Sequence, residues 1–219
     1  MKVLCYGDSN TWGYDAKNNC RFPYERRWCG ILSGLLGESA EIYEQGLGGR
    51  TTAFDDPLLK EASGLASLPY VKRSVFPLDF AVIMLGTNDS KTHLHLNAEC
   101  VKNGIEELIK TIKTPFFDSA LDCNPRVVLI SPPRILPRKS AEAPSPAFGE
   151  DSVRIIEQLP ALYAELAKKY DCDFVDAFSV LSGSSFDGIH LDEQGHKKLA
   201  YLVYDKITEN LQAKFFKLQ

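Results

Sequence analysis

The sequence has no long apolar run and no excess of basic charge. A membrane-spanning helix needs ~20 consecutive apolar residues and a secretory signal needs ~7 to 15, whereas the apolar run near the N-terminus covers only residues 3–5. The formal net charge is -4, which provides no basic surface to neutralise a phosphate backbone. We therefore expect a cytoplasmic protein with no membrane association and no nucleic-acid partner.

The six cysteines show no C-x-x-C spacing, which argues against a zinc site and against a dithiol redox pair. Cys5 and Cys29 lie in apolar patterns, where a free thiol behaves as a small hydrophobic group. Cys20 lies in a polar loop and is predicted to be the most exposed of the six. We interpret all six as structural thiols.

The sequence does contain strand-length apolar runs that alternate with helix-period segments, a pattern typical of a parallel sheet built from βα units. Strands are predicted at residues 2–6, 40–45, 79–86, 126–131 and 173–178. Helices are predicted at residues 26–37, 100–112, about 150–169 and about 193–213. Gly37 is expected to end the first of these helices and Asp192 to cap the last.

These elements predict an α/β fold with a doubly wound, three-layer α/β/α arrangement and a five-stranded parallel sheet. Right-handed crossovers with helices on both faces favour the strand order 2-1-3-4-5. The length suits one domain that spans residues 1–219. The Pro-, Ser- and Ala-rich segment 132–149 is predicted to be a long surface loop.

Polar motifs follow four of the five predicted strands. They are GDSNTWG at residues 7–13, GLGGRTT at 46–52, GTNDS at 86–90 and DGIH at 187–190. Because ligands bind outside the carboxyl ends of the strands in such sheets, the four segments are expected to meet at one edge.

The residue types in these motifs suit acyl transfer. The hydroxyl of Ser9 needs a base to take its proton, and His190 can be that base if Asp187 fixes its tautomer. A developing oxyanion needs hydrogen-bond donors. The candidates are the backbone N–H groups of Ser9 and Gly49 and the side-chain amide of Asn88.

The four motifs, in this order, resemble the four blocks of the SGNH (GDSL-type) hydrolases. RRW at 26–28, DDP at 55–57 and PLDFAVIMLGTND at 77–89 are similar to the bacterial arylesterase/acyltransferase branch. The resemblance implies a flavodoxin-like fold, hydrolysis of small aryl or alkyl esters, especially acetyl esters, through an acyl-enzyme, and acyl transfer to alcohols in some members. Several members of this branch form tight oligomers, so a homo-oligomer is a candidate state of this chain, and the resemblance implies no metal or organic cofactor.

The resemblance assigns the nucleophile to Ser9, the remaining triad members to Asp187 and His190, and the oxyanion hole to Gly49 and Asn88. The sequence departs from the family pattern beside the nucleophile.

Asn10 stands where the family more often has Leu, and Gly48 stands where the branch often has Ser. Asn10 and His93 are candidates for lining the substrate site. Trp12 either stacks on an aryl substrate or packs its loop against the sheet.

Other polar residues admit a structural interpretation. Asp8 is expected to bond the backbone of its own turn, and Asp89 to orient the turn that holds Asn88. Arg50 either binds a substrate carboxylate or, as we favour, forms an ion pair with Asp55 or Asp56.

His93 and His95 have the H-x-H spacing of a metal pair but no evident third ligand, so we expect no metal there. His196 is a rival to His190 as the base. It lies inside the last predicted helix, where pairing with Asp192 would be an ordinary surface contact, so His190 is preferred.

Three other functions remain as alternatives. An acetylated-carbohydrate esterase would use the same triad. A flavodoxin-like module would cradle a phosphate or flavin at SNTWG. A phosphatase with Asp8 as nucleophile would need a second acid where Asn10 stands.

Overall fold

A computed structural model describes the backbone of residues 1–115 and 124–216. Its central feature is a parallel five-stranded sheet in the order β4-β1-β5-β6-β7. The strands are β1 (Lys2–Gly7), β4 (Glu41–Gly46), β5 (Phe80–Met84), β6 (Arg126–Ile130) and β7 (Asp173–Val175). The order is the predicted 2-1-3-4-5, and the α/β doubly wound fold is confirmed.

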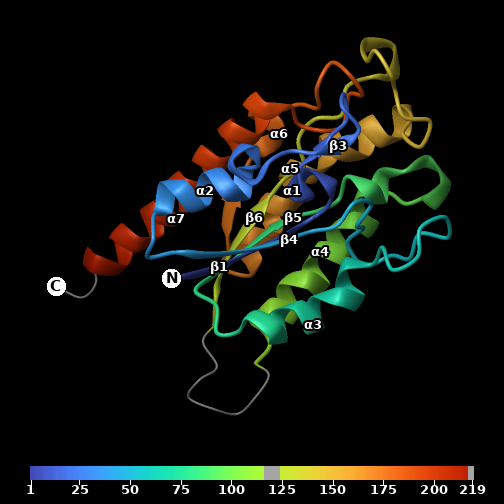
Figure 1. The fold of residues 1–219 in the computed structure, drawn as a ribbon. Coiled ribbons are helices and arrows are strands. Elements are labelled where there is room, and N and C mark those ends of the chain that lie inside the picture. The colour runs from blue at the N-terminus through green and yellow to red at the C-terminus, as the bar shows by residue number, and fades with distance from the viewer. Residues whose placement is uncertain (116–123, 217–219) are drawn as a thin grey trace.

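Helices cover both faces of the sheet (Figure 1). One face carries α2 (Trp28–Leu36) and α7 (Glu193–Phe216), and the other carries α3 (Gly64–Val75), α4 (Ala98–Lys113) and α5 (Glu150–Lys169). All five residues of β5 are buried because this strand lies between two neighbours and two helical layers. Alternate residues serve opposite cores: Ala81 and Ile83 face one helical layer, and Val82 and Met84 face the other.

The short elements lie mainly in the loops at the sheet edges. They are α1 (Ser9–Trp12), the hairpin strands β2 (Tyr14–Asp15) and β3 (Cys20–Arg21), α6 (Ala177–Val180), and the 3-10 turns η1 (Tyr24–Arg26), η2 (Asn88–Ser90), η3 (Thr92–Leu94) and η4 (Arg138–Ser140). None of the described helices is both long and apolar enough to cross a membrane.

The predicted helix ends are confirmed. Gly37 ends α2 with a φ of 73°, a conformation that favours glycine. Asp192 precedes α7, and its Oδ1 accepts a hydrogen bond from the N–H of Gly195 at 2.8 Å. This side chain therefore satisfies one of the free donors of the first turn.

Strands β5, β6 and β7 all end earlier than predicted, and the difference is largest for β7. The segment 173–178 is a strand only to Val175, because Asp176 caps α6 by accepting a hydrogen bond from the N–H of Ser179 at 3.1 Å.

The sequence interpretation also missed α3. The apolar spacing of this helix is interrupted by Pro69 and by Lys72, a buried residue whose ammonium donates to the carbonyls of Thr111 and Thr114. Because Lys72 is buried although it is charged, the apolar face of the helix cannot be recognised from the spacing of apolar residues.

The described cysteines agree with their predicted surroundings. Cys5 and Cys29 are buried in the core between the sheet and α2, and Cys20 is exposed. Cys123 lies outside the described residues.

Candidate active site

The first strand ends in a turn that places Ser9 at the start of α1. Asp8 caps this helix, and its Oδ1 accepts a hydrogen bond from the N–H of Asn10 at 2.9 Å. Gly7 is required just before the turn, because a Cβ there would lie 2.1 Å from a side-chain oxygen of α1. Asp8 is buried, and burial raises the pKa of its carboxyl group. These contacts agree with the interpretation of Asp8 as a residue that shapes the turn.

Ser9, His190 and Asp187 form one hydrogen-bonded chain. The Oγ of Ser9 lies 2.8 Å from the Nε2 of His190, and the Nδ1 of the same ring lies 2.5 Å from the Oδ2 of Asp187. When Nδ1 donates its hydrogen to Asp187, Nε2 is free to accept the hydrogen of the Ser9 hydroxyl. This is the geometry that a serine nucleophile and its general base require.

The carboxylate of Asp187 is held in place by its own loop. Its Oδ1 accepts hydrogen bonds from the N–H groups of Ile189 and His190 at 2.9 and 3.0 Å. Burial opposes ionisation, but the hydrogen bonds and the interaction with His190 outweigh it, so the pKa of Asp187 lies below its ordinary value. The group is therefore ionised at neutral pH, as the stabilisation of an imidazolium requires.

Tyr14 supports the imidazole from another side. Its ring meets the ring of His190 edge to face, with centroids 4.7 Å apart and an interplanar angle of 73°. Aromatic contacts of this geometry are favourable and directional. The sequence interpretation did not include Tyr14, because the contact joins opposite ends of the chain and no local pattern marks it.

Gly49 and Asn88 lie on the loops that follow β4 and β5, the two strands that flank β1. The Nδ2 of Asn88 donates to the carbonyl of Arg50 at 3.1 Å, and the same amide carries a second hydrogen. Gly49 has a φ of 80°, and a Cβ there would lie 2.1 Å from the side chain of Leu59. Backbone conformation and close packing therefore both call for glycine at this position.

Asp89 connects the two loops. Its carboxylate accepts from the N–H of Thr52 at 2.9 and 3.0 Å and from the Thr52 hydroxyl at 2.5 Å. Burial raises the pKa of Asp89 to about 6 although these hydrogen bonds favour the ionised form. Asp89 thus orients the turn that holds Asn88, as predicted, and fixes it against the loop that holds Gly49.

The predicted ion pair of Arg50 with Asp55 or Asp56 is wrong. The guanidinium of Arg50 lies 4.1 Å from the centroid of the Tyr6 ring and donates to the carbonyl of Gly7 at 2.8 Å, and it also donates to the carbonyl of Gln45. Arg50 therefore joins the ends of β1 and β4. The guanidinium charge of Arg50 therefore faces carbonyl oxygens and an aromatic ring. It forms no ion pair with Asp55 or Asp56.

The contacts of Asn10 favour a structural role, and its lining of the substrate site stays a prediction. The residue is 2% exposed, and both polar atoms of its side chain are bonded to the backbone of the loop that carries His190.

Trp12 packs within its own loop: the guanidinium of Arg21 lies 4.9 Å from the indole centroid, and the Nε of Arg21 donates to the Trp12 carbonyl at 2.7 Å. These contacts support the packing alternative for Trp12.

His93 belongs to a charged cluster beside Gly49. The Oδ1 of Asp56 lies 2.9 Å from the Nε2 of His93, and the Oδ2 of Asp56 accepts from the ammonium of Lys91 at 2.9 Å. A Cβ at Gly49 would lie 3.8 Å from that ammonium, so the cluster adjoins the loop of Gly49. Burial opposes ionisation of Asp56, but the two side-chain hydrogen bonds prevail and lower its pKa to about 2.

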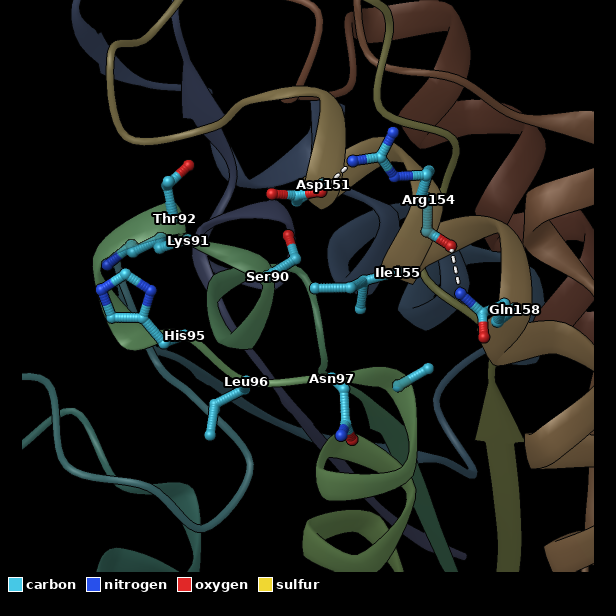
Figure 2. A pocket seen from close by; sticks show the side chains of 11 residues that line it. Ser90, Lys91, Thr92, His95, Leu96, Asn97, Asp151, Arg154, Ile155 and Gln158 are labelled. Atoms are coloured by element: carbon cyan, nitrogen blue, oxygen red, sulfur yellow. Dashed lines mark hydrogen bonds and ion pairs between the residues drawn. The ribbon is translucent and has the colours of Figure 1, made fainter.

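His95 and Lys91 of this cluster both line a cavity of about 480 Å³, which is formed by the segment after Asn88 and the first turns of α4 and α5 (Figure 2). Asp151 and Arg154, which also line the cavity, are bonded to each other. Ser9, Asp187 and His190 do not line it. Within residues 1–115 and 124–216, no group of three or more His, Cys, Asp or Glu residues is arranged to hold a metal ion.

His196 is buried, which corrects the expectation of a surface pair with Asp192. Its ring is inaccessible to solvent, its Nδ1 accepts a long hydrogen bond of 3.4 Å from the N–H of Trp28, and its ring packs against Phe22. Burial lowers the pKa of His196 to about 4. The side chain of His190, by contrast, is 17% exposed.

Comparison with known proteins places the chain in the class of carboxylic ester hydrolases. A family model described as the GDSL-like Lipase/Acylhydrolase family matches residues 5–198, and the chain belongs to this family. This confirms the resemblance of the four motifs to GDSL-type hydrolases and favours a hydrolase over a phosphate- or flavin-binding module.

Solved structures with the same fold include two esterases. Est24, a carbohydrate acetylesterase from Sinorhizobium meliloti, is 33% identical, with a TM-score of 0.87 over 95% of this chain and 99% of that chain. The aryl esterase of M. smegmatis is 31% identical, with a TM-score of 0.87 and the same coverage. An acetylxylan esterase of Xylanibacter ruminicola is 25% identical over 212 residues, which are 93% of this chain and 42% of that protein. The chain thus spans less than half the length of this curated relative.

Proposed function

We propose that the chain hydrolyses small acyl esters, with acetyl esters preferred, through an acyl-enzyme on Ser9. The observation that carries this proposal is the hydrogen-bonded chain from Ser9 through His190 to Asp187. The Ser9 oxygen attacks the ester carbonyl while His190 takes the hydroxyl proton, and ionised Asp187 stabilises the resulting imidazolium. His190 then donates that proton to the departing alkoxide. A water molecule, deprotonated by the same imidazole, releases the acid and restores the serine.

The charge on the tetrahedral intermediate needs donors that are in place before the reaction. In this proposal they are the N–H groups of Ser9 and Gly49 and the remaining amide hydrogen of Asn88. Two features support this assignment. The loops of Gly49 and Asn88 follow the strands on either side of β1, and Asp89 fixes them to each other through Thr52.

A small acyl group is supported by the packing around Gly49. The side chain of Leu59 approaches this glycine so closely that a Cβ would lie 2.1 Å from its Cδ2. An acyl chain that extends from the oxyanion hole toward Leu59 meets that side chain. We propose transfer of the acyl group to alcohols as an additional activity, in which an alcohol replaces the water molecule at the second step.

Acetylated carbohydrates are a second candidate substrate class. The names of two relatives support them, since one is a carbohydrate acetylesterase and the other an acetylxylan esterase. Both classes would use the same triad, so they differ only in the alcohol that leaves. The homo-oligomeric state and the cytoplasmic location expected from the sequence stay predictions.

A substrate panel tests this proposal. Purified protein and its Ser9→Ala variant are assayed with p-nitrophenyl acetate, p-nitrophenyl butyrate, phenyl acetate and a fully acetylated xylose. We expect wild-type activity that is higher on acetyl than on butyryl esters, and no serine-dependent activity in the variant. Equal rates for both proteins would contradict the nucleophile, and a preference for butyrate would contradict the small acyl site. A higher kcat/KM for the acetylated sugar than for both aryl esters would select the carbohydrate class.

A further inference from the structure

Asn10 bonds to the chain on both sides of His190. Its Oδ1 accepts a hydrogen bond from the N–H of Leu191 at 2.8 Å, and its Nδ2 donates to the carbonyl of Ile189 at 3.4 Å. Asn10 is 2% exposed as a residue, and Ile189 and Leu191 are also buried. A single side chain therefore satisfies one backbone donor and one backbone acceptor that flank the imidazole-bearing residue.

Asn10 is also fixed at its own backbone. It follows Ser9 directly on α1, and its N–H donates to the cap residue Asp8 at 2.9 Å. The same four-residue helix thus carries the hydroxyl of Ser9 and the amide that holds the His190 loop. Movement of the loop relative to Ser9 would break the contacts of this amide.

We propose that Asn10 is a positioning residue for His190, which sets the distance from Nε2 to the Ser9 hydroxyl. This inference rests on the proposed function and extends it. A displacement of about 1 Å between reacting groups can reduce a rate on the order of 10²-fold. The two polar contacts on either side of His190 restrain its backbone, while Asp187 and Tyr14 restrain its ring.

The required chemistry is specific to asparagine at this site. The side chain must accept a hydrogen bond from the N–H of Leu191 and donate one to the carbonyl of Ile189, so it needs an acceptor and a donor on the same Cγ. Leucine, the residue expected from the family pattern, has a similar size but neither polar atom. Aspartate keeps the acceptor for Leu191 but presents a second oxygen to the carbonyl oxygen of Ile189.

These differences define a graded set of variants. Asn10→Leu removes both contacts, and Asn10→Asp removes only the donated one. Asn97→Leu is the matched control, because the Oδ1 of Asn97 likewise accepts a backbone hydrogen bond, from Cys100 at the start of α4, and its loss lowers stability without touching the His190 loop.

The experiment measures kcat and KM for p-nitrophenyl acetate and p-nitrophenyl butyrate, with thermal unfolding and proton NMR on each variant. We expect Asn10→Leu to lower kcat on the order of 10²-fold for both esters with KM changed less than threefold. Asn10→Asp should lose less than Asn10→Leu, and Asn97→Leu should keep the wild-type kcat. The far-downfield signal of the His190 Nδ1 proton should broaden or vanish in Asn10→Leu and persist in the control.

Two results would overturn the positioning role. One is a folded Asn10→Leu variant with a kcat within twofold of wild type and an unchanged Nδ1 signal. The other is a loss that depends on acyl length, which would make Asn10 a specificity residue. If Asn10→Leu does not fold, Asn10→Asp decides between the same outcomes. An active Ser9→Ala variant would instead refute the proposed function itself, so the two failures are distinguishable.

Discussion

The Nε2 atom of His190 lies 2.8 Å from the Oγ atom of Ser9, although 181 residues separate them in the chain. Ser9 starts the helix after the first strand, and His190 lies in the loop that leads to the last helix. The contact therefore joins an N-terminal loop and a C-terminal loop at the edge of the sheet where the strands end. It also makes the proposed reaction dependent on both residues as one unit.

The first prediction concerns that dependence. Ser9→Ala should lower kcat for p-nitrophenyl acetate by a factor on the order of 10⁶, and His190→Ala should lose a similar factor, because neither group activates the ester alone. The double variant should lose no more than either single variant. Steady-state kinetics of the three proteins check this, and losses that multiply in the double variant would show independent roles.

The second prediction concerns the proposed oxyanion hole. Asn88→Ala should lower kcat on the order of 10² to 10³-fold with little change in KM, because the amide donates to charge that develops only in the transition state. Asn103→Ala, an exposed asparagine on α4, is the matched control. A main effect on KM would instead mean that Asn88 binds the ground state. Thermal unfolding of Asn88→Ala separates loss of the hydrogen bond to Arg50 from loss of catalysis.

The order of the sheet could be predicted because its signals are local. Each central strand is a short apolar run bounded by polar motifs, and β5 is buried on both faces as its sequence indicates. Chirality of the crossovers then leaves few topologies. The four motifs meet at one edge as a consequence of this topology. The candidate triad could therefore be predicted without knowing the distances between its residues.

The contacts that support the triad could not be predicted in this way. Tyr14 and Asn10 reach His190 or its neighbours from the other end of the chain, and no spacing within a motif encodes those contacts. The predictions for Arg50 and His196 are wrong for a related reason. The partners of a charged or titratable side chain depend on which backbone groups the turns bring near it, and only the folded chain shows them.

The third prediction concerns His196 and acid stability. Burial lowers its pKa to about 4 in the folded chain, against about 6.5 in an unfolded chain. The unfolded chain therefore binds the proton more tightly, so the stability contributed by neutral His196 is complete above pH 6.5 and is lost as the pH falls toward 4. The loss amounts to about 3 kcal/mol of the free energy of unfolding.

Urea unfolding of wild type and His196→Asn between pH 7 and pH 4 checks this contribution. The asparagine keeps an acceptor for the N–H of Trp28 but does not titrate, so the variant should lose less stability over this range. Its kcat at pH 7 should stay within tenfold of wild type, whereas His190→Ala should be inactive. A variant as acid-sensitive as wild type would contradict the neutral buried imidazole, and an inactive folded variant would restore His196 as a candidate base.

The last prediction concerns the charged cluster beside Gly49. The pKa of Asp56 is lowered to about 2, below the value of about 3.9 for an unfolded chain. Its ionised form therefore stabilises the fold above pH 4, and this contribution is lost as the pH falls through 2. Lys91 and His93 are partly exposed, so screening by solvent reduces the contribution to about 1 kcal/mol.

Asp56→Asn should lower the free energy of unfolding by at least this amount at pH 7, and the difference from wild type should shrink toward pH 2. Asp55→Asn, a change at the exposed neighbour, should stay within about 0.5 kcal/mol of wild type at both pH values. Equal effects of the two substitutions in urea unfolding would mean that the cluster does not stabilise the loop.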